Sequence, residues 1–550
     1  MDELVIEANL RNDSHDAGSG GGSTNKRELP KTQLETFIIL PFQIAKPGHM
    51  KWKKCEFHEF LKDGGWVKLD SHEPDEISKV DLDETALKRI RYQAYNYFHP
   101  FVRSFWFDQN LVQRFRRSDV AELDVKIGQI TSSFDAVCDL LHFTPDIAVL
   151  VLHLKSKNFL DLKDAQNCLD RLRRIYPPFL GDGYGGHFPD VVELLDKSGA
   201  TVEKFEINQL IDLQGRAAAH EEKGGESTHT HVWARHWEKL ISPIGINEES
   251  FVARQLGDDR AALASMVTVS GVADSLPLPQ RIDQGNIVRL CFADGSGSDR
   301  SPYSERYLKN FEPRFCYDRF WYLDGESSEY PSRIMNCGYA FTWLGDGLDT
   351  GYFANQSNGA PVAFRHIYVP MAIIAHFQKA ALLVTSRKLA DLTPYAKDGQ
   401  LGELSLEKFK ALKHNFIAFT QTYWFDEITP QEQGVELFAT WRRELNLQSL
   451  YDETRQEIQD VVEYADYLQS SKQSKSAHRL NLYASIFAVI SLVLGYISMV
   501  GTVVSVDKGE SNSILFKVVL ETTPWAMLLG LAVLIIAVLK RICNKNKGNK

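Results

Sequence analysis

The 550-residue sequence lacks any pair of closely spaced cysteines. Zinc ribbons and thioredoxin-like redox motifs need two cysteines separated by two residues, so this absence argues against both. Isolated cysteines are typical of a protein that stays in a reducing compartment. The sequence has seven: Cys55, Cys138, Cys168, Cys291, Cys316, Cys337 and Cys543.

The sequence also lacks an excess of positive charge. Its 62 basic and 72 acidic residues give a net charge of -10. This balance argues against nucleic acid as a partner, because binding to phosphates needs clustered Lys and Arg. The main basic cluster before the C-terminal region is Arg114–Arg117, which we expect to be a solvent-exposed face.

Motifs of known enzyme classes are missing as well. There is no nucleophile elbow, no HExxH and no kinase signature. The loops 181–186 and 345–351 are rich in Gly and Asp but lack the Gly-Lys-Ser/Thr of a phosphate loop, so we predict turns. The N-terminus has no basic region followed by an apolar run and does not resemble a signal peptide. We therefore expect a non-enzyme whose N-terminal part stays in the cytosol.

The pattern of the first 365 residues predicts an α+β or α/β region. Residues 1–30 contain a Gly/Ser stretch and are expected to be a flexible tail. Residues 31–215 form the predicted cytosolic α/β domain, with strand candidates TFIILPF, FDAVCDLLHF and DIAVLVLHLK and the helix candidate LKDAQNCLDRLRRIY. Residues 216–365 are a second mixed region or a further part of the same domain. Its strand candidates are ASMVTVSG, GNIVRLCFAD and RIMNCGYAFTWLGD.

Residues 366–482 are predicted to be helical and to include a long stalk helix. One amphipathic helix is expected at 404–425, and a second begins after Thr429 as N-cap with Pro430 at its first position. Nothing between about 431 and 505 clearly breaks this second helix. It carries a heptad seam that needs a partner helix, in the same chain or in another copy. The seam is Leu447, Tyr451, Thr454, Ile458, Val461, Ala465 and Leu468.

Two apolar segments near the C-terminus predict a membrane hairpin. Residues 483–504 carry no charge and are long enough, at about 1.5 Å per residue, to cross a hydrocarbon core of about 30 Å. Residues 522–540 form the second predicted span, 505–521 the external loop and 541–550 a basic tail. Lys and Arg are concentrated before the first span and after the second span. Since positively charged flanks stay in the cytoplasm, both termini are expected there.

The first span carries a stripe of small and polar residues at spacings of three and four. Such a stripe can line a pore in an oligomer, or it can be a close packing face between helices in lipid. The candidate pore-lining residues are Asn481, Ser485, Ser491, Gly495, Ser498 and Thr502, with Ala488 in the same row.

Residues 430–550 resemble the CorA-like family of divalent-cation transporters. Arg479 and Asn481 are similar to the family's Arg-x-Asn before the first span, and 495–500 (GYISMV) stands where the family has Gly-Met-Asn. Met499 matches this signature, whereas Ser498 replaces its Gly and Val500 its Asn. The resemblance implies a homo-oligomer, a pentamer in the family, in the inner (plasma) membrane. It also implies a divalent cation such as Mg²⁺ as the transported ion.

Two further groups of residues are candidate metal ligands. His229, His231 and His236 lie in HTHVWARHW, where two imidazoles can share one side of a strand, although Trp233 and Trp237 also fit the start of an amphipathic helix. Asp452, Asp460 and Asp466 lie on the acidic stalk and can bind a divalent ion if several copies bring them together; otherwise they are a solvated face.

These observations predict a CorA-like oligomeric membrane protein in which a cytosolic domain gates a cation pathway along the first span. The alternative is a membrane-anchored sensor or a signalling or defence effector, in which the cytosolic region binds a small molecule or partner and no ion is transported.

Overall fold

The computed structural model describes residues 30–45, 54–69, 77, 82–144, 146–176, 187–206, 233–245, 251–270, 276–298, 303–321, 331–349, 351–392, 403–506 and 525. The chain divides into two units, Met1–Val462 and Glu463–Lys550. The first holds a mixed β-sheet followed by helices, and the second holds the greater part of one long helix.

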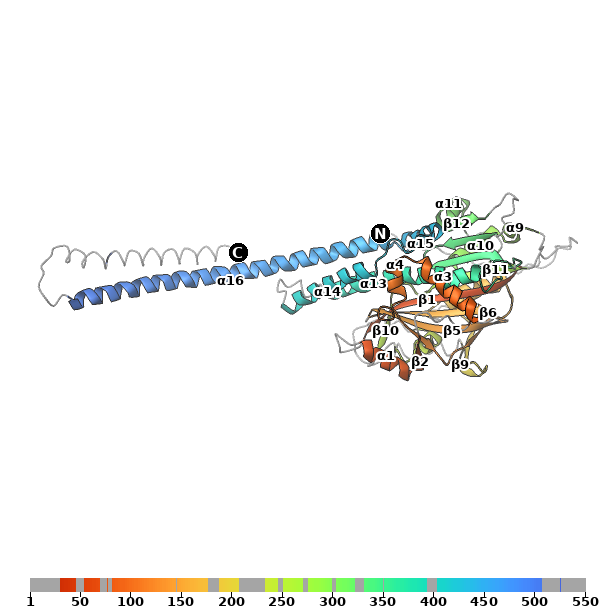
Figure 1. Ribbon diagram of the computed structural model, residues 1–550, viewed down its shortest axis with the longest axis horizontal. Coiled ribbons are helices and arrows are strands. Elements are labelled where there is room, and N and C mark those ends of the chain that lie inside the picture. The colour runs from red at the N-terminus through yellow and green to blue at the C-terminus, as the bar shows by residue number, and fades with distance from the viewer. Residues whose placement is uncertain are drawn as a thin grey trace, which may run out of the picture. The chain divides into compact units, whose positions relative to one another are not determined.

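Within the described residues of the first unit, fourteen strands form one sheet (Figure 1). The main strand order is β12-β13-β14-β11-β1-β6-β5-β4-β8-β9. Four strands lie off this path: β7 and β10 pair with β1, β3 pairs with β5, and β2 pairs with β3. The pair β11/β14 is parallel and the other pairs are antiparallel. The strands are β1 (Lys31–Ala45), β2 (Trp66–Leu69), β3 (Gln113–Arg117), β4 (Glu122–Ile127), β5 (Ile130–Thr144), β6 (Ile147–Ser156), β7 (Leu160–Asp161), β8 (Val191–Leu195), β9 (Thr201–Glu206), β10 (Val252–Gln255), β11 (Ala262–Ser270), β12 (Cys316–Phe320), β13 (Ser332–Asn336) and β14 (Ala340–Asp346).

The sheet joins strands from both predicted mixed regions, because β1 pairs with β6 on one side and β11 on the other. Alternate residues of β1 face opposite sides of the sheet. Leu34, Ile38 and Phe42 enter a core shared with α5, α8 and α10. Glu35 and Phe37 point to the other side, where α13 packs on β1 and β6.

The helices precede, interrupt and follow the sheet. They are α1 (Lys54–Asp63), α3 (Glu84–Tyr97), α4 (Pro100–Trp106), α5 (Leu162–Leu172), α8 (Arg235–Ile241), α9 (Leu278–Arg281), α10 (Gln284–Phe292), α11 (Glu305–Phe315), α12 (Ala360–Ala363), the π-helix η2 (Phe364–Tyr368), α13 (Val369–Leu392), α14 (Glu403–Thr422), α15 (Glu432–Glu444) and α16 (Leu447–Val506).

Most predicted elements of the first unit are confirmed. The segments TFIILPF, FDAVCDLLHF, DIAVLVLHLK and ASMVTVSG lie in β1, β5, β6 and β11, and RIMNCGYAFTWLGD forms the β13–β14 hairpin. The predicted helix at 162–176 is α5, and the one at 404–425 is α14. The prediction of a strand for GNIVRLCFAD was wrong, since this segment is α10. Its apolar residues are buried nearly all round, and a short buried run has no periodicity that separates strand from helix.

The unbroken helix predicted from about 431 to 505 was also wrong. The chain forms α15 and then α16, separated by Leu445 and by Asn446, which has a left-handed φ of 55°. Asn tolerates this conformation better than most residues. The N-cap of α15 is Gln431 rather than Thr429, whose hydroxyl instead donates a 2.6 Å hydrogen bond to Tyr97 O.

The basic cluster Arg114–Arg117 is a further correction. It forms β3, and Arg116 and Arg117 are buried rather than solvated. Arg116 makes a bidentate ion pair with Asp139, and Arg117 makes one with Asp119. The sheet buries these cations because neighbouring strands and turns supply the carboxylates that neutralise them.

Candidate functional site

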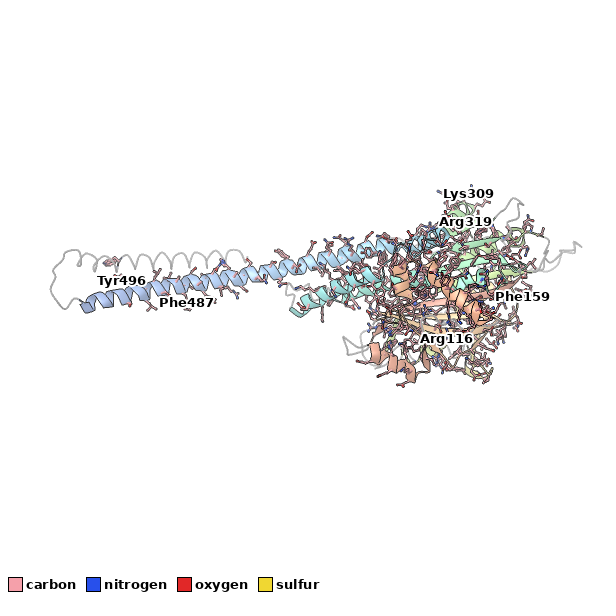
Figure 2. The ribbon with its side chains drawn as sticks, in the orientation of Figure 1. Arg116, Phe159, Lys309, Arg319, Phe487 and Tyr496 are labelled. Atoms are coloured by element: carbon pink, nitrogen blue, oxygen red, sulfur yellow. The ribbon has the colours of Figure 1, made fainter. Side chains whose placement is uncertain are left out.

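The predicted membrane segment lies in α16, and several of its large apolar side chains between Tyr483 and Leu494 are exposed in the single chain. Phe487, which Figure 2 labels, is 68% exposed and Leu492 is 74% exposed. The stretch Leu447–Tyr496 is long and apolar enough to cross a membrane, and none of its most apolar window is buried. Exposed apolar side chains of this size and number need lipid or other protein around them.

The candidate pore-lining residues follow one another along this helix. Asn481, Ser485, Ser491, Gly495 and Ser498 are exposed. The Ser485 hydroxyl donates a hydrogen bond to the carbonyl oxygen of Asn481 at 2.8 Å. Its donor is therefore paired with the backbone of the same helix. A Cβ built on Gly495 meets no atom within 4 Å. Met499, Val500 and Thr502 also lie in α16.

The second predicted span, 522–540, lies outside the described residues except for Trp525, which is helical and exposed. A different helix passes the same test of length and composition as α16. This is Ala360–Leu392, and 83% of its most apolar window is buried inside the first unit. The described residues thus include two helices that could cross a membrane by length and composition, and one of them is a core helix.

The start of the heptad seam finds its partner helices in the same chain. Leu447, Thr454 and Ile458 are buried. The ring of Tyr451 stacks on Trp424 with centroids 4.5 Å apart, and the Thr454 hydroxyl lies 3.1 Å from that of Ser386 in α13. The later seam residues Ala465 and Leu468 lie on α16 in the second unit.

The candidate acidic ligands of α16 do not converge within one chain. Asp452 accepts hydrogen bonds from Gln448 at 3.2 Å, and Asp460 accepts one from Gln456 at 2.6 Å, each between residues four apart on the helix. Asp466 is exposed. In the part of the chain that the structure describes, no group of three or more His, Cys, Asp or Glu is arranged to hold a metal ion.

His229 and His231 lie outside the described residues, whereas His236 lies in α8. Its ring is buried near Phe188 and Trp237, and neither ring nitrogen has a hydrogen-bond partner among the described residues. Burial lowers the pKa of His236 to about 3, so the imidazole is neutral. The helix start suggested by Trp233 and Trp237 is confirmed.

In the predicted turn 345–351, β14 ends at Asp346 and turn residues follow at 347–348 and 351, while residue 350 lies outside the described residues. The Asp346 carboxylate makes a bidentate ion pair with Arg281, and Asp349 accepts hydrogen bonds from the backbone N–H groups of Gly351 and Tyr352. These carboxylates hold the loop in place. The loop 181–186 lies outside the described residues.

A buried ionic cluster between the sheet and η2 was not predicted from the sequence. Glu35 of β1 accepts hydrogen bonds from Arg365 Nε and Nη2 at 2.5 and 2.8 Å and lies 2.9 Å from His153 Nε2. The His153 ring stacks on Phe37 with centroids 3.8 Å apart. All three polar side chains are at most 3% exposed. Burial alone would raise the pKa of Glu35, but Arg365 and His153 more than offset it and hold that pKa well below its usual range.

The signal for this cluster is a charged residue inside an otherwise apolar segment. Glu35 stands beside TFIILPF, His153 inside VLVLHL and Arg365 inside VAFRHIY. A charged group in a buried segment requires a partner, but the sequence does not say which one. Arg365 sits in a π-helix, a rare feature that is frequent at functional sites.

A cavity of about 400 Å³ opens on the same side of the sheet, beside β2, β3 and β5. Val67, Leu69, Ile77 and Val137 form an apolar wall. Charged residues of both signs also line the cavity: Arg116, Arg117, Glu122, Asp135 and Lys197. A cavity of this size with an apolar wall and a few charged groups is the usual form of a small-molecule site. Figure 2 labels Arg116 within this sheet.

Comparisons of the chain with family models, curated proteins and solved structures give no match.

Proposed function

We propose that this protein is anchored in a membrane by α16 and acts as a CorA-like oligomeric cation transporter or channel gated by its cytosolic region. The observation that carries the proposal is the unbroken course of α16 from Leu447, buried in the first unit, into a segment where Phe487, Leu492 and other large apolar side chains are exposed. One continuous helix is a direct mechanical link between a folded region and a membrane span.

In the proposed mechanism, copies of the first span surround an axis, because two helices of one chain cannot enclose an aqueous path. Hydroxyl groups and exposed backbone of the stripe from Asn481 to Thr502 face this axis and interact with a hydrated divalent ion such as Mg²⁺. Hard cations prefer such oxygen ligands. The orientation follows from the Lys and Arg that flank the spans, with both termini in the cytoplasm of the inner membrane.

Ion flux in liposomes tests the transport proposal. The purified full chain should pass Mg²⁺ down a gradient, and Ser498→Leu and Thr502→Leu should reduce the flux at least tenfold because they replace hydroxyls with bulky apolar groups. Ile490→Leu, outside the stripe, is the matched control and should retain flux.

Sizing of the protein in detergent measures assembly independently of flux. A monomer would exclude the pore, because one chain supplies only one copy of the stripe. An intact oligomer without flux under any divalent gradient would contradict transport and leave the second candidate.

The second candidate is a membrane-anchored sensor that binds a small molecule in its cytosolic region. The cavity beside β2, β3 and β5 favours it, because apolar and charged groups of both signs meet there. Replacement of the signature Asn by Val500 favours it too.

Ligand-dependent thermal shifts across a panel of anionic and zwitterionic metabolites test this candidate. Val137→Phe, which fills the cavity from its apolar wall, should abolish any shift, while Val125→Ile on the opposite face of the sheet should leave it unchanged. A shift that survives Val137→Phe would place the ligand elsewhere.

A further inference from the structure

Helix α3 has one side that combines exposed aromatic and basic side chains. These residues recur at spacings of three and four, so they follow a single face of the helix. Ile90 and Ala94, which are buried, lie on a different face. Tyr92 is 71% exposed. The exposed residues of this face are Lys88, Arg91, Tyr92 and Tyr95.

Side chains of α4 extend this surface. The Arg103 guanidinium lies over the ring of Tyr95, 5.1 Å from its centroid, and joins the two helices. Phe101, near the start of α4, is 51% exposed. Residues 84–106 hold four Lys and Arg against one Glu. Aromatic residues and Arg are enriched in protein interfaces. The basic aromatic face consists of Lys88, Arg91, Tyr92, Tyr95, Phe101 and Arg103.

The first turns of α16 carry the opposite charge. Residues 447–462 hold four Asp and Glu against one Arg. Three of these acids are exposed, recur at spacings of four and three, and lie away from the buried Thr454 and Ile458. Carboxylates four residues apart on a helix repel each other, and a cation from outside the helix relieves this repulsion. The acidic face consists of Glu453, Glu457 and Asp460.

We propose that the basic aromatic face of one copy docks on the acidic face of a neighbouring copy. This inference rests on the oligomer of the proposed function, since it names the surfaces that join its copies. The two faces are different surfaces of one chain, as the head-to-tail contacts of a closed ring require. Opposite charges determine which surfaces meet, while the aromatic rings supply apolar contact area.

The two faces lie at the same level of the first unit. Phe101 packs on Phe425 with ring centroids 5.5 Å apart. The adjacent Trp424 stacks on Tyr451 in α16 with centroids 4.5 Å apart. These two ring contacts connect the basic aromatic face to the part of α16 just before Glu453. Copies in a ring are related by rotation without a shift along the axis, so surfaces at one level can meet.

A photoactivatable cross-linker identifies the occupant of the basic aromatic face. The full chain with p-benzoylphenylalanine in place of Tyr95 is irradiated in detergent, and a denaturing gel separates linked copies. We expect a linked dimer whose cross-linked peptide contains residues 447–462 of the second copy. The same cross-linker in place of Tyr307, which is 39% exposed on α11, is the matched control and should give no dimer.

Exchange of charges tests the electrostatic contact. Arg91→Glu and Glu457→Arg should each lower the fraction of oligomer at least about threefold in low salt, because attraction becomes repulsion. The double variant should restore assembly, since the two charges are again opposite. Both residues are exposed, so limited proteolysis should show an intact fold. Lys309→Glu, at an exposed position of α11, is the control for loss of a cation elsewhere and should assemble normally.

Salt separates the charged from the apolar part of the interface. At about 1 M salt, where the Debye length is about 3 Å, Arg91→Glu should differ less from the wild type. Tyr92→Ser should remain impaired at every salt concentration, because it removes apolar contact rather than charge.

The outcomes separate this interface from ion transport. An oligomer that none of the three single variants Arg91→Glu, Glu457→Arg and Tyr92→Ser weakens, a double variant that stays as weak as the single ones, or a Tyr95 cross-link to lipid or to another part of the chain would overturn the interface alone. A monomeric wild type would overturn both the interface and the pore. The expected cross-link and charge rescue without Mg²⁺ flux would support the interface and contradict transport.

Discussion

Among the described residues, two helices have the length and composition of a membrane span, and they differ in how much of their apolar surface is buried. In Ala360–Leu392 most of the apolar window is buried, whereas in Leu447–Tyr496 none of it is. The first packs on β1, β6 and β11 and against α14 and α15. Phe377 at its centre stacks on Phe143 with ring centroids 4.2 Å apart. Hydropathy reports how favourable it is for a segment to leave water, but it does not distinguish a protein core from a lipid bilayer. Only the packing partners separate a core helix from a candidate span.

The strongest test of this difference in burial is to place a charge in each helix. Ile374→Lys in α13 puts an unpaired ammonium at a fully buried position and should cost more than about 4 kcal/mol, enough to unfold the first unit. Leu492→Lys replaces a side chain that is 74% exposed and should leave the first unit folded, while weakening membrane insertion by about 2.5–3.5 kcal/mol. Limited proteolysis reports the fold, and carbonate extraction reports insertion.

The opposite pattern of results would show that the two helices have been assigned the wrong way round. In that case Ile374→Lys would remain resistant to protease, and Leu492→Lys would unfold the first unit. Leu492→Met is the control for a change of shape without charge.

The ionic cluster at the start of the core helix gives the next largest effect. Arg365 lies in η2, directly before α13, and its loss leaves the buried Glu35 carboxylate beside His153 without its guanidinium partner. We expect Arg365→Leu to cost about 3–5 kcal/mol of unfolding free energy at pH 7. Urea unfolding followed by tryptophan fluorescence measures this cost.

The pH dependence of this variant has a definite sign. In the wild type the pKa of Glu35 is lowered, so its contribution to stability is present above the usual carboxyl pKa of 4.5 and is lost as pH falls below it. In Arg365→Leu burial raises the pKa of Glu35, so protonation relieves the uncompensated charge. The deficit relative to wild type should therefore shrink as pH falls from 7 toward 4.5. Adding Glu35→Gln should remove this pH dependence; a deficit that is constant with pH would contradict it.

The smallest effect concerns the break before α16. Asn446 has a φ of 55°, in the left-handed region that favours Gly and, to a lesser degree, Asn. Asn446→Ala should destabilise the first unit by about 1 kcal/mol, whereas Asn446→Gly should be neutral or slightly stabilising. Thermal unfolding of both variants measures the difference. Equal melting temperatures of the two variants would mean that the backbone relaxes at this position. The left-handed conformation of residue 446 would then not be required between α15 and α16.

The elements that were predicted correctly are those with a clear local period. β1, β5, β6 and β11 alternate or run continuously apolar between turn residues, and Leu162, Ala165 and Leu169 recur at helical spacing in α5. The misassigned α10 has no such period, because Gly285 and Asn286 are buried along with its apolar residues. The break at Asn446 was missed because a single residue in the left-handed conformation leaves no periodic signal.

The candidate sites divide in the same way. The stripe from Asn481 to Thr502 is a pattern within one helix, so the sequence shows it completely. The cluster of Glu35, His153 and Arg365 and the cavity beside β3 each join residues more than twenty positions apart. Local spacing carries no information about such contacts.

By itself, the sequence determined the order of the protein's parts: a mixed α/β region, a helical region and apolar segments near the C-terminus, because each depends on the composition and period of a short stretch. Only the tertiary structure decided which apolar helix is covered and which arginines are neutralised by carboxylates. Those outcomes depend on burial and on partners, and both arise only when strands and helices from distant parts of the chain pack together.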